Sequence, residues 1–92
     1  MTAFHHVSKP RAVSYLGRVC DMQEFYLNAS KNGRRISVRR WRDTGEVELR
    51  AITGDGRTDR FLQLGTDVLD PVDATPEYVA LRARAMADRY WS

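Results

Sequence analysis

Three glycine-containing turn signals divide the middle of this 92-residue chain into segments of strand length. The signals are Asn32-Gly33, Asp43-Thr44-Gly45 and Asp55-Gly56. Such sequences are typical of β-hairpin connections, because Asn, Asp and Gly tolerate the backbone conformations that tight turns need. The segments between the turns alternate in polarity or are rich in β-branched residues. They predict strands over residues 22–30, 35–42, 46–53 and 59–64, with residues 12–20 as a further strand.

A helix is predicted after these strands. Thr75-Pro76-Glu77 combines an N-capping residue, a proline suited to the first helical position and an acid in the first turn. We expect the helix over residues 76–90, preceded by an acidic connector over residues 65–75. At 100° per residue, one face of this helix carries Val79, Ala83, Met86, Ala87 and Tyr90.

The expected fold class is therefore α+β: an antiparallel sheet of four to five strands in a meander, with one C-terminal helix packed on it. We expect residues 1–92 to form a single domain, with residues 1–10 as a flexible arm. No apolar run approaches the roughly 20 residues of a membrane helix, and the first residues lack the features of a signal peptide. We accordingly expect a cytoplasmic protein that does not bind membranes.

The sequence leaves open which face of the sheet is the core. With the shortest loops at each turn signal, the register gives both faces an apolar patch. One face carries Phe25, Leu27, Ala29, Ile36 and Val38, and the other carries Tyr26, Arg39, Trp41, Val47, Leu49, Leu62 and Leu64. A single helix covers one face, so the sheet curls into a partial barrel, or a bulge exchanges its faces, or one patch binds another molecule. We expect the second face to serve a homodimer or another partner, and the helix to cover Val47, Leu49, Leu62 and Leu64.

The most informative functional feature is a run of basic residues. Residues 31–42 contain six Lys or Arg and no acid, whereas residues 67–77 contain four acids and no base. A hairpin with basic groups at its tip and an aromatic ring among them suits a phosphate backbone, because phosphates attract cations and flat rings stack on bases. The residues expected to contact nucleic acid or a protein partner are Lys31, Arg34, Arg35, Arg39, Trp41 and Tyr26.

An ordinary structural role accounts for the same residues. In the register described above, Arg40 and Arg42 face Glu48 and Glu46 and form ion pairs across the hairpin. In that interpretation Trp41 belongs to the core, and the basic residues near Asn32-Gly33 are solvated side chains of a turn.

The sequence contains no pattern typical of a catalytic or metal site. His5 and His6 are adjacent, and neighbouring strand residues point to opposite sides. Cys20 has no nearby base that would activate it, and the aspartates of the connector lack the spacing of a calcium loop. We therefore expect a protein that is not an enzyme and has no cofactor, no metal and no small-molecule substrate.

From Arg34 to Trp91, the chain resembles the three-stranded sheet with one helix at the N-terminus of tyrosine recombinases. The resemblance rests on the Arg-rich strand, the turn Asp55-Gly56-Arg57, the strand spacing and the C-terminal helix. The chain departs from that pattern in its acidic connector and its additional N-terminal strands. In that family the sheet enters the major groove of DNA, so the resemblance implies DNA contacts by Arg39, Trp41 and Arg50.

These features predict a small non-enzymatic binding protein whose Arg-rich hairpin engages nucleic acid or a nucleic-acid-handling complex, through backbone charge more than base recognition. The alternative is an inhibitor or accessory protein of the kind that phages and mobile elements encode. Such a protein docks on a larger protein, for example a host defence complex, by its sheet face or edge. The two functions differ in salt dependence, because phosphate binding weakens steeply with salt and an apolar interface does not.

Overall fold

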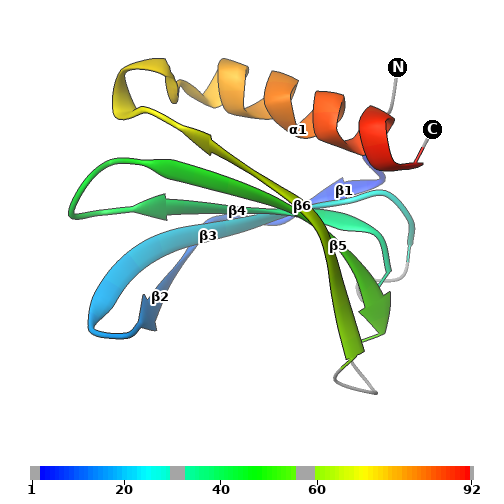
Figure 1. The fold of residues 1–92 in the computed structure, drawn as a ribbon, viewed down its shortest axis with the longest axis horizontal. Helices are drawn as coiled ribbons and strands as arrows, with labels where there is room; N and C mark the ends of the chain where they lie inside the picture. The colour runs from blue at the N-terminus through cyan, green and yellow to red at the C-terminus, as the bar shows by residue number, and fades with distance from the viewer. Residues whose placement is uncertain (1–2, 30–32, 56–59, 92) are drawn as a thin grey trace.

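The structure is a computed structural model that describes residues 3–29, 33–55 and 60–91. In this part of the chain, an antiparallel sheet is followed by one long α-helix (Figure 1). The sheet order is β1-β3-β4-β5-β6, and β2 also pairs with β3. The expected α+β fold is confirmed. The elements are β1 (His6–Val7), β2 (Arg11–Tyr15), β3 (Arg18–Tyr26), β4 (Arg35–Trp41), β5 (Val47–Asp55), β6 (Arg60–Leu69), the 3-10 helix η1 (Pro71–Asp73) and α1 (Pro76–Trp91).

The single strand expected over residues 12–20 is wrong, because a hairpin turn divides it. Tyr15 at the end of β2 pairs with Arg18 at the start of β3, so only Leu16 and Gly17 form the loop. Both have positive φ, 51° and 78°, as a two-residue type I′ turn requires. Leucine rarely adopts this conformation, so the turn lacks the usual sequence signal.

The flexible arm expected over residues 1–10 is also wrong for its described part. The His5 amide donates to the Tyr26 carbonyl (2.8 Å), and the Ser8 amide donates to the Glu24 carbonyl (2.9 Å). The Phe4 ring packs edge-on against Phe25 with ring centroids 5.1 Å apart. Backbone pairing and an apolar contact therefore attach this segment to β3.

The connector expected over residues 65–75 begins later than predicted. β6 continues to Leu69 and η1 follows, because β6 pairs with β5 along its whole length. A register shift opposite Ala51 and Ile52 accommodates an extra residue in β6. The helix starts at Pro76 as predicted, and the Tyr78 amide donates to the Thr75 hydroxyl (3.2 Å), which confirms the N-cap.

The predicted register of β4 and β5 is wrong by one residue. Arg40 pairs with Val47 and Val38 pairs with Leu49, so the loop has four residues, not three. The Trp41 amide closes this loop on the Glu46 carbonyl (2.9 Å). A slip of one residue moves every side chain of a strand to the other face. The expected ion pairs of Arg40 and Arg42 with Glu48 and Glu46 are therefore absent from the described ion pairs.

The other two hairpins also differ from the shortest-loop prediction. Ile36 pairs with Phe25, not with Ala29, and Leu62 pairs with Thr53, not with Leu49. The expected turns at Asn32-Gly33 and Asp55-Gly56 fall partly on residues outside the described part of the chain.

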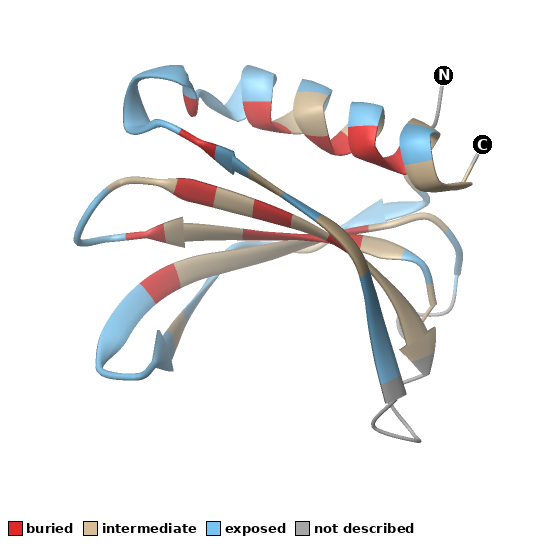
Figure 2. Ribbon diagram, in the orientation of Figure 1, coloured by how far each residue is buried: buried red, intermediate tan, exposed pale blue. Residues whose placement is uncertain are grey.

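The core lies between α1 and one face of the sheet, here called the helix face (Figure 2). Val47 and Leu49 join Ile36 and Val38 there, so the predicted separation of these residues onto two faces is wrong. Leu62, which the helix was expected to cover, is 60% exposed. The predicted apolar face of the helix is confirmed. The buried cluster is Phe25, Ile36, Val38, Val47, Leu49, Ala51, Leu69, Ala74, Val79, Ala83, Met86 and Ala87.

The side of the sheet that faces away from α1 is here called the open face. Its side chains are the alternate residues of each strand, including Glu24, Tyr26, Arg35, Arg39 and Arg50. The β2–β3 hairpin and the far ends of β5 and β6 bend away from α1, so they flank the open face (Figure 1).

Candidate functional site

The open face contains a hollow of about 360 Å³ between residues of β3, β4, β5 and β6. Ser37 is 4% exposed and lies at its floor, whereas most of the lining side chains are longer and polar. Three arginines converge on this hollow. Arg35 and Arg39 lie on either side of Ser37 among the alternate residues of β4, and Arg50 on β5 pairs with Ser37. The lining includes Met22, Arg35, Ser37, Arg39, Arg50 and Phe61.

Arg39 and Arg50 place two like charges beside each other. Arg50 pairs with Ser37 and Arg39 pairs with Glu48, which makes the two arginines diagonal neighbours on one face. Burial, and next the charge of Arg39, lower the pKa of Arg50, while Glu48 opposes this effect. The guanidinium stays charged at neutral pH, because arginine keeps its proton in proteins.

The Arg50 Nε atom is buried and has no hydrogen-bond partner among the described residues. Glu48 Oε1 lies 3.4 Å away, close enough for an ion pair but not aligned for a hydrogen bond. Arg50 Nη1 donates to Gln63 Oε1 over a long 3.5 Å. One carboxylate and one distant amide therefore leave much of the Arg50 donor capacity unused.

Arg35 is better compensated. Its Nε lies 3.1 Å from Glu24 Oε2, and its Nη1 donates to the Gly33 carbonyl (3.2 Å). Glu24 also lies 3.9 Å from Arg11. Burial, followed by a hydrogen bond to Glu24, raises the pKa of Tyr26. Glu24 thus neutralises the Arg35 side of the hollow, in contrast to the Arg39 side.

Two half-exposed aromatic rings flank the hollow, each against a guanidinium. The Arg39 guanidinium lies 5.4 Å from the Tyr15 ring centroid, and that of Arg35 lies 5.0 Å from the Phe61 ring centroid. Tyr15 and Phe61 are each 51% exposed, although each ring contacts a guanidinium. Both rings therefore keep surface available for another flat group.

Trp41 is buried, unlike these two rings. It is 8% exposed, and the Arg18 guanidinium covers it at 4.2 Å. Asp43 holds Arg18 in place through Nε–Oδ2 and Nη2–Oδ1 hydrogen bonds of 2.7 and 2.9 Å. This hydrogen bonding is the main cause that lowers the pKa of Asp43 and raises that of Arg18.

The charges of the open face do not cancel. Arg11, Arg18, Arg35 and Arg50 each have a carboxylate within 4.0 Å, and they share Glu24, Asp43 and Glu48. Arg39 has no such partner in the described ion pairs. Glu46 is a fourth carboxylate on this side, close enough to act on the charge of Arg18, so the five arginines exceed the carboxylates by one, with Arg39 unpaired in the described ion pairs.

The structure brings together only part of the predicted binding set. Arg35, Arg39 and Tyr26 lie on the open face, and Trp41 lies there but buried. Arg34 is exposed beside the start of β4, where its carbonyl accepts from the Leu27 amide (3.0 Å). Lys31 falls outside the described residues.

Arg50 and Phe61 line the hollow and Tyr15 contacts Arg39 beside it, but none of the three was in the predicted binding set. Only the resemblance to the recombinase domain pointed to Arg50. The period-two pattern of β5 places Glu48, Arg50 and Ile52 on one face, so a correct register would have joined Arg50 to Arg39. For Tyr15, the Leu16-Gly17 turn hid the hairpin that carries it.

The hollow offers guanidinium donors and flat ring surfaces. In the described part of the chain, no group of three or more His, Cys, Asp and Glu side chains is arranged to hold a metal ion. None of the described helices is long and apolar enough to cross a membrane. No protein family, curated protein or solved structure matches this chain.

Proposed function

We propose that the open face binds single-stranded nucleic acid, with phosphate groups on Arg39 and Arg50 and bases against the rings of Tyr15 and Phe61. The observation that carries this proposal is the pair of neighbouring guanidiniums of Arg39 and Arg50. Arg39 has no carboxylate partner in the described ion pairs, and the buried Arg50 Nε, which lies 3.4 Å from Glu48, has no hydrogen-bond partner among the described residues. An anion between the two arginines relieves both features.

The unpaired Nε atom favours a ligand because leaving a buried donor unsatisfied costs about 1–3 kcal/mol. Burial is the main cause that lowers the pKa of Arg50, and the charge of Arg39 lowers it further, so repulsion between the two guanidiniums adds to this cost. A phosphate group accepts hydrogen bonds from guanidiniums in a forked geometry and neutralises them. The charge excess also attracts a polyanion from a distance.

The two exposed rings favour a single strand over a duplex. Unpaired bases present their faces, and each base that stacks on an aromatic ring contributes about 1–3 kcal/mol. Tyr15 is on β2 and Phe61 is on β6, with three strands between them. Four strand spacings correspond to roughly 19 Å across a sheet, perpendicular to its strands. A separation of this size between the two rings suits several nucleotides better than one.

The test is fluorescence anisotropy with labelled single strands of fifteen thymidines or fifteen uridines, and with a fifteen-base-pair duplex, at two salt concentrations. We expect single-strand binding that weakens with salt. The variant Arg39→Gln/Arg50→Gln should lower affinity at least tenfold and reduce the slope of log K against log salt by about 1.4, or 0.7 for each of two lost phosphate contacts.

The matched control is Arg84→Gln/Arg89→Gln on α1, which changes the net charge equally. It should keep most of the affinity, because these arginines lie on the helix and outside the hollow. The single variant Arg39→Gln provides a second measurement with minimal risk to folding, since Arg39 has no described carboxylate partner. Equal losses in the α1 control, unchanged affinity in the Arg39 variants, or preferred binding of the duplex would overturn the proposal.

A second candidate function is docking on a larger protein through the edge strand β6. β6 pairs with β5 on one side only in the described sheet, and an edge strand presents unpaired amide and carbonyl groups to an added strand. Leu62 and Val68 on this strand are 60% and 56% exposed. This candidate predicts partner binding that is insensitive to salt and to Arg39→Gln, and that Val68→Lys abolishes.

A further inference from the structure

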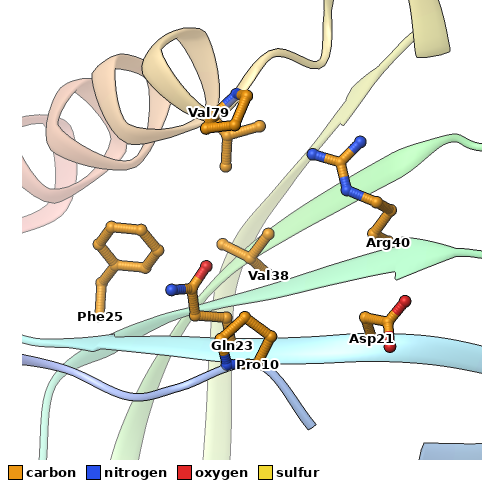
Figure 3. Close-up of a pocket in the computed structure, with 8 residues that line it drawn as sticks. Pro10, Asp21, Gln23, Phe25, Val38, Arg40 and Val79 are labelled. Atoms are coloured by element: carbon orange, nitrogen blue, oxygen red, sulfur yellow. The ribbon is translucent and has the colours of Figure 1, made fainter. Parts of the chain in front are cut away.

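A second concave site lies on the helix face, between the first half of α1 and β3 (Figure 3). It is a groove of about 370 Å³ with Pro10 and Pro76 among its lining residues. It exists because α1 makes its main sheet contacts with β4 and β5, which leaves the β3 side of the helix face less covered. The open-face hollow and this groove are on opposite sides of the sheet.

The groove is apolar at one end, and Arg40 and Asp21 line the other. Phe25, Val38 and Val79 are 7%, 5% and 4% exposed, and they line its apolar part. Arg40 lies two residues beyond Val38 on β4, on the same face. Figure 3 shows Phe25 and Arg40 on opposite sides of Val38, with Val79 above them on α1. A ligand there meets a hydrocarbon surface and a guanidinium in turn.

Arg40 does not form an ion pair with Asp21, the residue opposite it on β3, in the described ion pairs. It pairs across the sheet with Asp21, but Arg42 binds the Asp21 carboxylate through Nη2–Oδ1 and Nε–Oδ2 hydrogen bonds of 2.7 and 3.1 Å. Arg40 Nη2 instead donates to the Ala74 carbonyl (2.9 Å). No carboxylate lies within 4.0 Å of Arg40 in the described ion pairs, and its one described hydrogen bond uses one of five N–H donors. The hydrogen bond from Arg42 is the main cause that lowers the pKa of Asp21, and the charge of Arg40 contributes to the same effect.

We propose that this groove binds a small carboxylic acid with an apolar body. The carboxylate pairs with the Arg40 guanidinium, and the hydrocarbon part packs against Phe25, Val38 and Val79. The groove volume lies at the lower end of the range for small-molecule pockets, which are mostly apolar with a few polar groups. A helix, about 10 Å across with its side chains, needs a larger groove. This ligand differs from the sequence-based expectation of no small-molecule substrate.

The test uses octanoate as the probe, at concentrations below micelle formation, with octan-1-ol and octyltrimethylammonium as analogues of the same chain length. Methyl signals of Val38 and Val79 in two-dimensional NMR spectra report binding in the groove. We expect octanoate to shift these signals saturably. Octanol should bind about tenfold or more weakly, because its neutral hydroxyl cannot form the charged, forked pair with Arg40, and the cation should not bind.

The variant Arg40→Gln should weaken octanoate binding about tenfold or more and leave octanol binding unchanged. Arg84→Gln on α1, which removes an arginine outside the groove, should bind octanoate like the original chain. Arg40→Lys keeps the charge but loses the forked geometry, so it should give an intermediate affinity. If Arg40→Gln does not fold, Arg40→Lys tests the proposal instead. Its ratio of octanoate affinity to octanol affinity should be lower than that of the original chain.

The proposal is overturned if octanoate shifts the Val38 and Val79 methyl signals no more than octanol does, or if an Arg40 variant that folds keeps the full preference for octanoate. It is also overturned if the saturable shifts lie on residues outside the groove. None of these outcomes bears on nucleic-acid binding by the open face, because the two sites share no residue of their linings.

Discussion

β4 supplies both faces of the sheet, and its alternate residues have opposite fates. Ile36 and Val38 are buried beneath α1, whereas Arg35 and Arg39 line the hollow of the open face. On the helix face, a cluster of apolar side chains is buried beneath α1, and Arg40 and Asp21 lie beside it in the groove. The open face consists of charged side chains, only some of which are paired. One strand of seven residues thus contributes to stability on one side and presents charge on the other.

The two faces differ in what they contribute to the free energy of folding. Burial of apolar surface on the helix face is worth about 25 cal/mol for each Å² removed from water. Exposed ion pairs such as Arg18–Asp43 contribute little to stability, because solvent screens the attraction between the two charges. The open face can therefore change its charges with little loss of stability, which suits a surface that binds a charged ligand.

The largest effect expected from this comparison concerns Leu49 and Val68, which lie on opposite faces. Leu49 is fully buried, so Leu49→Ala should lower the free energy of unfolding by about 2–5 kcal/mol through lost burial and a cavity. Val68 is 56% exposed, so Val68→Ala should change the free energy of unfolding by about 0.5 kcal/mol or less. Urea denaturation of both variants measures this, and similar losses would contradict the assignment of the faces.

A smaller effect is expected at Gly65, where the Tyr90 side chain packs directly on the β6 backbone. A Cβ atom at this position would overlap the Tyr90 hydroxyl, so Gly65→Ala should cost about 1–3 kcal/mol by overpacking. In a Tyr90→Ala background the same substitution should cost much less, because the clash is gone. Urea denaturation of the original chain, the two single variants and the double variant measures this coupling. If the losses in unfolding free energy were additive, the packing of Tyr90 on Gly65 would be excluded.

The smallest effect concerns Asp43, whose exposed ion pair lies at the end of the open face. Arg18→Gln should raise the pKa of Asp43 towards its ordinary value of 3.8, because the hydrogen bond that lowers it is lost. Since the folded-state pKa is lowered, the pair stabilises the fold above the unfolded pKa and loses this contribution as pH falls through the folded pKa. Carboxyl NMR titration measures the shift. Arg42→Gln, which removes the partner of Asp21, should leave the Asp43 pKa unchanged.

The α1 prediction succeeded because its signals are local. Thr75 caps the helix, Pro76 begins it and the spacing of Val79, Ala83 and Met86 defines the buried side. The strands were also recognisable from their polarity and turns. Their existence depends on neighbouring residues in the sequence, which a single chain provides directly.

The register was not predictable in the same way. The difference between a three-residue and a four-residue loop at Gly45 decides whether Val47 and Leu49 join Ile36 and Val38 or oppose them. The choice depends on the packing of a core that both strands share with α1, which is non-local. The same limit applies to the candidate site: Arg39 was identified from the sequence, but its position beside Arg50 depends on the correct pairing of β4 and β5.

The central claim is that the open face, and not the helix face, binds nucleic acid. The most direct measurement is side-chain NMR during titration with fifteen-nucleotide single strands. We expect shifts for the rings of Tyr15 and Phe61, the Nε–H of Arg39 and Arg50 and the Met22 methyl, whereas the Val79 and Leu49 methyl signals should not move. Shifts confined to the helix face, or no shifts at low salt, would contradict it.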